Sequence, residues 1–109
     1  PIVSAIVKEG LAETAVVKQR EVFDAAIKFT KCEGILPAPE SAHAIKVAID
    51  EALKAKEEGI SKTILFNLSG HGHFDLSAYE HALAGDLSDC DYSKEEVEKN
   101  LKFLPEVKL

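Results

Sequence analysis

The sequence contains no methionine, and only 2 of its 109 residues are cysteine. Cys32 and Cys90 are too few for a disulfide framework, so we expect reduced thiols and a cytoplasmic location. No apolar run approaches the roughly 18 residues that a membrane-spanning helix requires. The start also lacks the basic-then-apolar pattern of a signal peptide. These absences exclude a disulfide-rich secreted module and an integral membrane segment.

The chain has fewer basic than acidic residues. The chain has 13 basic against 19 acidic residues and a formal net charge of −6. This balance argues against nucleic acid or an anionic membrane surface as the main partner. Hydrophobic residues make up 46% and charged residues 29% of the chain, which is ordinary for a globular protein.

Hydrophobic periodicity and capping residues predict helices over 1–8, 21–31, 42–58, 75–83 and 93–103. Ser41 is the expected N-cap of the third helix, and Ser93 with Glu96 forms a capping box that opens the last. Short β-branched or apolar runs predict strands over 14–17 and 62–68, with a very short one at 34–36.

Alternating helices and strands predict an α/β fold, a small parallel sheet flanked by helices. Two or three strands are too few to stand alone comfortably. The chain also opens directly into the apolar segment 2–7 without a polar start. We therefore expect residues 1–109 to be part of a larger domain, with other strands supplied by further sequence or by a partner.

Two loops are candidates for chemistry, because ligands in open α/β sheets bind outside the carboxyl ends of strands. Ser69-Gly70-His71-Gly72-His73 follows the best predicted strand, and Glu33-Gly34 opens the proline-containing connection. Glycine allows a backbone to approach a ligand closely, and the Ser69 hydroxyl can donate or accept a hydrogen bond. A tight turn without a ligand explains the same residues.

Glu33 stands at a predicted helix end, where the helix dipole disfavours a negative charge. A residue placed against local preference indicates function, although a solvated carboxylate is the alternative. His71 and His73 allow a metal-binding module, with Asp75, His81 or Cys90 as a third ligand. Their spacing fits no recognised zinc motif, so we assign no metal site.

Two longer segments contain these candidates. They are CEGILPAPESAHA at 32–44 and LSGHGHFD at 68–75. Together, in this order and at this separation, they resemble two signature segments of the tryptophan synthase beta chain, and most closely its second, beta-like branch. The likeness runs from the start of the chain to about the last predicted helix.

The resemblance implies part of a fold-type II, pyridoxal-phosphate-dependent lyase that makes L-tryptophan from indole and a serine-type amino acid. By the same resemblance, Glu33 is catalytic and lies near the cofactor ring, and Ser69 hydrogen bonds the pyridine nitrogen. Gly34 and Gly70 would pack against the cofactor. A neutral hydroxyl at Ser69 does not force protonation of the ring nitrogen, which favours replacement over transamination. The parent is expected to be a homo-oligomer.

Other features set limits on this interpretation. His71, Pro39 and Ala42 depart from the main branch, which leaves docking to an alpha subunit open. The Schiff-base lysine and the Gly-rich phosphate loop of the family have no counterpart here. We therefore expect this chain alone to be inactive. A non-catalytic structural or oligomerisation domain and a His-x-His metal module remain the alternatives.

Overall fold

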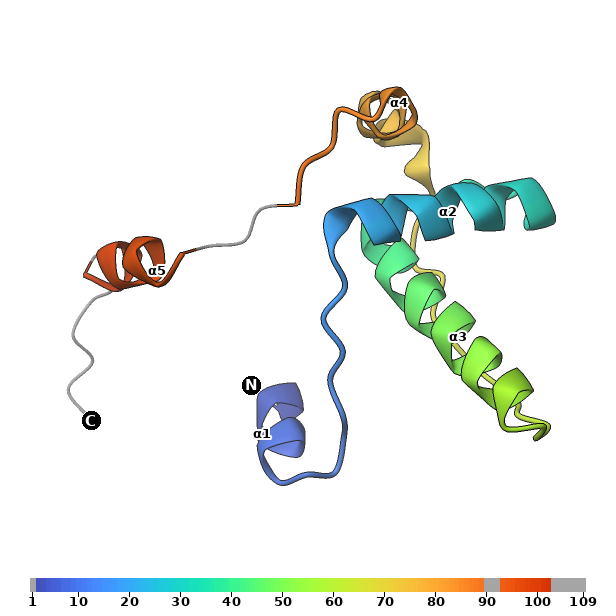
Figure 1. The fold of residues 1–109 in the computed structure, drawn as a ribbon, viewed down its shortest axis with the longest axis horizontal. Coiled ribbons are helices and arrows are strands. Elements are labelled where there is room, and N and C mark those ends of the chain that lie inside the picture. Colours follow the sequence, from blue (N-terminus) through green and yellow to red (C-terminus); the bar gives the residue numbers. More distant parts are fainter. Residues whose placement is uncertain (1, 90–92, 103–109) are drawn as a thin grey trace.

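The computed structural model describes residues 2–89 and 93–102, and over these residues the chain is helical. Its elements follow one another along the chain as drawn in Figure 1. They are α1 (Ile2–Lys8), α2 (Gln19–Glu33), α3 (Pro39–Glu57), the 3-10 helix η1 (Gly72–Phe74), α4 (Leu76–Ala84) and α5 (Lys94–Leu101). All of the predicted helices are present, with shifted ends. Cys90 and the predicted helix end at 103 lie outside the described residues.

Helix α2 supplies four of the eight buried hydrophobic residues that the structure describes. Val22, Phe23, Ala25 and Ala26 are buried on one face, at the spacing of an amphipathic helix. Gly34 ends the helix in the left-handed conformation with φ 70°, and its N–H donates to the carbonyl of Thr30. Glycine adopts this conformation without the steric penalty of a side chain, so the helix ends here.

Helix α3 begins earlier than predicted. Ala38 is its N-cap and Pro39 its first residue; proline suits this position because the first helical N–H has no partner within the helix. The prediction that Ser41 caps a helix starting at residue 42 was therefore wrong. Ser41 lies inside the first turn, where its side chain makes other contacts. Ala42 and Ile45 are buried on the face of α3 that packs on α2.

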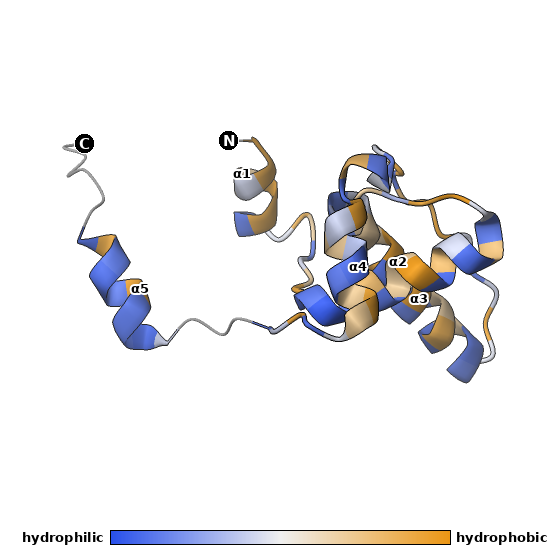
Figure 2. Ribbon diagram, turned by 90° about the horizontal axis from the view of Figure 1, so that it is seen from above, coloured by the Kyte–Doolittle hydropathy of each residue, from blue (hydrophilic) through white to orange (hydrophobic). Residues whose placement is uncertain are grey.

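Helix α4 completes the core from the other side of α2. Tyr79 is 5% exposed, and its ring meets Phe23 edge-on, with centroids 5.1 Å apart and planes at 81°. Such edge-to-face pairs stabilise by about 0.5–1.5 kcal/mol beyond the area they bury. The core cluster is therefore built where α2, α3 and α4 meet, and Figure 2 shows apolar residues concentrated there.

The predicted parallel sheet is absent from the described residues, so the α/β expectation was wrong for this part of the chain. Residues 14–17, 34–36 and 62–68 form no strand. A strand requires a neighbour that exchanges backbone hydrogen bonds with it, and no backbone–backbone bond holds residues 61–68 to another described segment. An isolated antiparallel bridge between Pro37 and His71 is the only extended pairing there. Apolar composition predicted the strand, but a ladder also needs a partner.

The segment 62–68 instead returns beside α3 (Figure 1). Phe66 meets Phe29 of α2 edge-on at 6.0 Å, whereas Leu65 is 94% exposed. The segment thus keeps the alternation of a half-buried strand without a sheet around it.

The end helices contribute nothing to this core. Neither α1 nor α5 has a buried residue. The radius of gyration is 17.3 Å, against about 13 Å for a compact domain of this length. Among the described helices, none combines the length and apolar character that a bilayer crossing needs. The structured unit is therefore the α2–α3–α4 core with its connecting loops.

Candidate functional site

The two motif segments meet in space. The Ala38 N–H donates to the Gly70 carbonyl, and the Gly72 N–H donates to the Leu36 carbonyl, both at 2.9 Å. These bonds flank the bridge between Pro37 and His71. We call this pairing of residues 36–38 with 70–72 the clasp. It joins the connection after α2 to the loop before η1, so the candidate residues of both loops belong to one region.

Close packing in the clasp explains two of its glycines. A Cβ at Gly72 would lie 2.4 Å from the Pro37 oxygen and 2.9 Å from the Tyr79 ring, whereas one at Gly70 would lie 3.2 Å from the Ala38 Cβ. Contacts below 3.0 Å do not occur between real atoms of this kind, so Gly72 tolerates no side chain. Gly70 packs on Ala38, which is a structural role. A contact with a cofactor would be a second role.

Ser69 is held by a second serine. Its backbone N–H donates to Ser41 Oγ at 3.1 Å, and the two hydroxyl oxygens are also 3.1 Å apart. Ser41 is buried, with 4% of its surface exposed, whereas Ser69 is exposed. The arrangement holds the exposed residue Ser69 at a fixed backbone position, with its hydroxyl beside that of Ser41.

Glu33 and Gly34 lie at the end of α2. The Glu33 carboxylate is exposed and makes no hydrogen bond or ion pair with the residues that the structure describes. Gly34 has open space where a Cβ would be, so its positive φ alone accounts for glycine. No contact in the described chain joins Glu33 to Ser69. The structure therefore places Gly70 in the clasp, Ser69 directly before it, and Glu33 outside it at the end of α2.

The two loop histidines are near each other but do not make a metal centre by themselves. Their ring centroids are 4.9 Å apart, and His71 Nδ1 accepts a hydrogen bond from the His73 N–H at 3.3 Å. Within residues 2–89 and 93–102, no group of three His, Cys, Asp or Glu side chains could hold an ion. The metal module therefore lacks its third ligand there.

Tyr79 is the residue of this region that sequence reasoning missed. Its phenol donates to the Pro37 carbonyl at 2.6 Å, which ties α4 to the clasp. Burial, with a smaller effect from the nearby Asp75 carboxylate, raises the pKa of Tyr79 to about 12. Tyr79 lies within the predicted helix 75–83, at helical spacing from Leu76 and Leu83, but nothing in the sequence indicated its partner 42 positions earlier.

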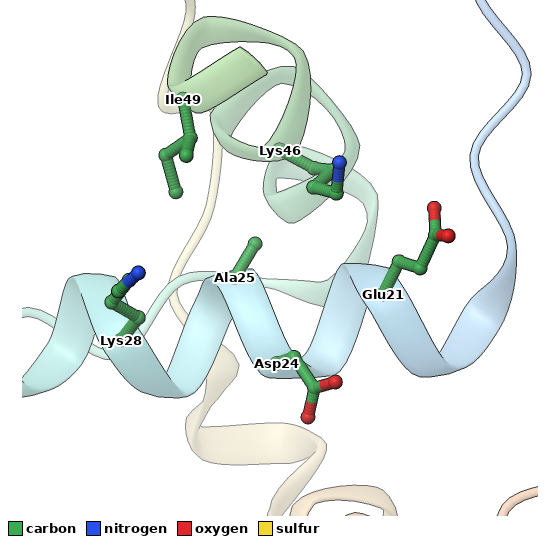
Figure 3. Close-up of a pocket in the computed structure, with 6 residues that line it drawn as sticks. All are labelled: Glu21, Asp24, Ala25, Lys28, Lys46 and Ile49. Carbon is green, nitrogen blue, oxygen red and sulfur yellow. The ribbon is translucent and has the colours of Figure 1, made fainter. Parts of the chain in front are cut away.

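The surface hollows do not coincide with the predicted residues. One, of about 350 Å³, lies between α2 and α3 and is lined by Glu21, Asp24, Ala25, Lys28, Lys46 and Ile49. Figure 3 shows Ala25 pointing toward α3 and Asp24 pointing away from it. An apolar hollow of about 430 Å³ lies between α2 and α4, beside Leu36 and Tyr79. Neither includes Glu33, Gly34, Ser69 or Gly70.

Comparison with known proteins identifies the family of these motifs. No family model matches the chain. The tryptophan synthase beta chain 2 of Methanosarcina acetivorans is 61% identical over 87 residues, or 80% of this chain and 20% of that protein. The same protein of Aquifex aeolicus is 61% identical over 89 residues, which cover 82% of this chain and 20% of the relative. A tryptophan synthase beta chain of Thermococcus onnurineus is 56% identical over 97 residues, 89% of this chain and 21% of the relative.

This chain is a homologue of a segment of the tryptophan synthase beta chain. The match lies in the C-terminal fifth of these relatives, so the chain spans about a fifth of the length of the curated beta chains it matches. The resemblance read from the two motif segments is confirmed. By their names, these beta-chain relatives act in tryptophan biosynthesis.

The residues present can be tested against the cofactor that the beta-chain resemblance implies. The hydroxyl of the exposed residue Ser69, which is held through its own backbone N–H, suits one hydrogen bond to a ring nitrogen. A Cβ at the adjoining Gly70 would point at Ala38 within the clasp, so Gly70 places no side chain beside Ser69. These residues fit one edge of pyridoxal phosphate. The sequence contains no Gly-rich run of the kind that binds a phosphate group.

Proposed function

We propose that this chain forms one wall of the site of a pyridoxal-phosphate-dependent lyase that makes L-tryptophan from indole and a serine-type amino acid. Two observations support the proposal: the identity of 55–61% with beta chains and the hydroxyl of the exposed residue Ser69, whose backbone N–H is anchored by Ser41. A cytoplasmic location and a homo-oligomeric parent are part of the same proposal. Docking to an alpha subunit stays open.

Ser69 would hold the pyridine nitrogen of the cofactor with its hydroxyl. When bound, pyridoxal phosphate supplies an electron sink for cleavage at the β-carbon of the amino acid. A neutral serine leaves the ring nitrogen unprotonated more readily than a carboxylate would. The clasp fixes Gly70 and Ser41 fixes the adjoining Ser69, so both residues would lie next to the cofactor ring.

Glu33 would contribute from the other loop. Its carboxylate is exposed at the end of α2, where the helix dipole raises the cost of a negative charge. Such a group gains from a nearby proton donor or cation, which the cofactor and substrate could provide. We assign it the position beside the ring, with Gly34 allowing the chain to turn away directly after it.

The chain alone is expected to be inactive. It contains no lysine in a Schiff-base motif and no Gly-rich run that could bind the phosphate. Mixing the purified 109-residue chain with pyridoxal phosphate, indole and L-serine should give no tryptophan. Tryptophan formation by this chain would contradict the division of the site.

The test uses the protein at the full length its gene encodes. Ser69→Asp should change the absorbance spectrum of bound pyridoxal phosphate and depress tryptophan formation, because a carboxylate favours a protonated ring nitrogen. Ser77→Asp, at an exposed position of α4, is the matched control for an added charge. Wild-type spectrum and rate in Ser69→Asp would sink the assignment of Ser69.

A second candidate is a structural or oligomerisation role. Several large apolar side chains are almost fully exposed, including Val16 at 97%, Leu65 at 94% and Phe74 at 92%. A contact with other polypeptide would cover these side chains, and contiguous exposed apolar patches mark such contacts. Self-association of the purified chain in sedimentation, together with no cofactor binding at full length, would favour this candidate over the first.

A further inference from the structure

The hydroxyl of Ser41 has a more defined role than core packing. Ser41 occupies the third position of α3, which is anchored on α2 through the neighbouring Ala42. Its oxygen accepts the Ser69 N–H and lies within hydrogen-bond distance of the Ser69 hydroxyl. No other polar group in the described chain bonds the Ser41 hydroxyl.

These two contacts fix the direction of the hydroxyl protons. A serine oxygen carries one proton to donate and two lone pairs to accept with. If Ser69 donated to Ser41, the Ser41 oxygen would accept twice and its own buried proton would have no acceptor. Leaving a buried donor unsatisfied costs about 1–3 kcal/mol. The favoured arrangement therefore has Ser41 donating to Ser69 Oγ.

We propose that Ser41 is a positioning residue that makes Ser69 a hydrogen-bond donor toward a ligand acceptor, such as a neutral ring nitrogen. With Ser41 donating, the proton of the Ser69 hydroxyl is not used by Ser41 and is available to another acceptor, and Ser69 itself is an exposed residue. The chain of bonds from the Ser69 N–H through Ser41 to the Ser69 hydroxyl also polarises that hydroxyl, which strengthens it as a donor. The ligand in this proposal is that of the proposed function, on which it rests.

The first test needs no cofactor. Ser41→Ala removes one oxygen and puts a good helix former in a helix, so the fold should persist. We expect the Ser69 amide to exchange its hydrogen at least about fivefold faster in Ser41→Ala, because its acceptor is lost. Tyr79→Phe, which removes the side-chain bond from α4 to Pro37 of the clasp, should leave the Ser69 amide within about twofold of wild type. Unchanged Ser69 exchange in Ser41→Ala overturns the proposal.

The second test measures binding of pyridoxal phosphate to the protein at its full encoded length. Ser41→Ala should weaken binding by about 2–10-fold, the value of one hydrogen bond, and should move the pH at which the bound cofactor's absorbance changes. Tyr79→Phe should move neither. Equal effects of the two variants would reduce Ser41 to a structural part of the clasp and overturn the proposal, as would wild-type binding by Ser41→Ala.

The two tests separate the inference from the function beneath it. If the wild-type protein binds no pyridoxal phosphate, the proposed function fails and the ring nitrogen is no longer the acceptor. The exchange rate of the Ser69 amide in Ser41→Ala then tests by itself whether Ser41 positions Ser69.

Discussion

The phenol of Tyr79 on α4 donates a 2.6 Å hydrogen bond to the carbonyl of Pro37 in the clasp. The same ring packs edge-on against Phe23 of α2. Proline has no N–H of its own to offer, so its carbonyl is the only backbone group through which Pro37 can be held. One side chain thus connects α2, α4 and the clasp.

Removing this phenol should destabilise the fold without changing its shape. Tyr79→Phe leaves the Pro37 carbonyl unsatisfied in a buried position, so the free energy of unfolding should fall by about 1–2 kcal/mol. Chemical denaturation followed by circular dichroism measures the change. Ser77→Ala, at an exposed position of the same helix, is the control and should stay within about 0.5 kcal/mol. Equal midpoints for Tyr79→Phe and wild type would contradict the role of the bond.

Tyr79 should also make stability depend on alkaline pH. Burial raises the pKa of Tyr79 to about 12 in the folded chain, against about 10 in an unfolded one. The neutral phenol is favoured by folding, so its contribution is fully present below about pH 10 and is lost as the pH rises toward 12. Unfolding midpoints measured across this window should fall more steeply for wild type than for Tyr79→Phe. Parallel curves would show that another group controls the transition.

Gly72 should be the least replaceable residue of the clasp. A Cβ there would stand 2.4 Å from the Pro37 oxygen, which is backbone and cannot rotate away. We expect Gly72→Ala to cost about 3 kcal/mol or to open the clasp, since overpacking of this kind is destabilising. Gly70→Ala, whose Cβ would meet Ala38 at 3.2 Å, should cost clearly less. Thermal unfolding of the two variants gives the ranking, and a reversed order would show that the clasp is looser than its contacts indicate.

The return segment 61–68 should be the least protected part of the core region. No backbone–backbone hydrogen bond holds it to another described segment, so its amides exchange without any opening step. The amides of Val22 and Ala26, in buried α2, should exchange slowest. Amide exchange read residue by residue provides the comparison. Slow amide exchange at 62–68 in the purified chain would contradict this expectation, because it would mean that another copy of the chain pairs with the segment in solution.

Helices were predictable because their signals are local. The burial pattern of α2, the glycine after Glu33 and the capping box at Ser93 each act within one or two turns, and the structure has all three. The strands were not predictable in this way, because a strand forms only where a neighbouring strand exchanges backbone hydrogen bonds with it. The run at 62–68 has the right residues, yet the described chain gives it no ladder.

The site was predictable only in part for the same reason. The two loops were recognised by their motifs, but their meeting in the clasp depends on how α3 packs. Pro39 at the first helical position was a signal that α3 starts before Ser41. With that start, Ser41 would have been seen as available for a bond outside its own helix. No sequence signal pointed to the bond between Tyr79 and Pro37.

The length of helix α3 sets the shortest connection that can bring Ser69 back to Ser41. From Ser41 to its end at Glu57 the helix rises about 24 Å, and the chain from Glu57 back to Ser69 reaches at most about 40 Å when fully extended. Deleting four residues between Glu58 and Leu68 would leave about 26 Å, too little to cover the helix and also turn back at Gly59. The hydrogen bond between Ser69 and Ser41 would then break, and the Ser69 amide would exchange faster. Inserted residues would instead extend the turn and leave this bond in place. The spacing between the two motifs therefore has a lower limit set by helix length, and the turn at the far end of α3 is where related chains can grow.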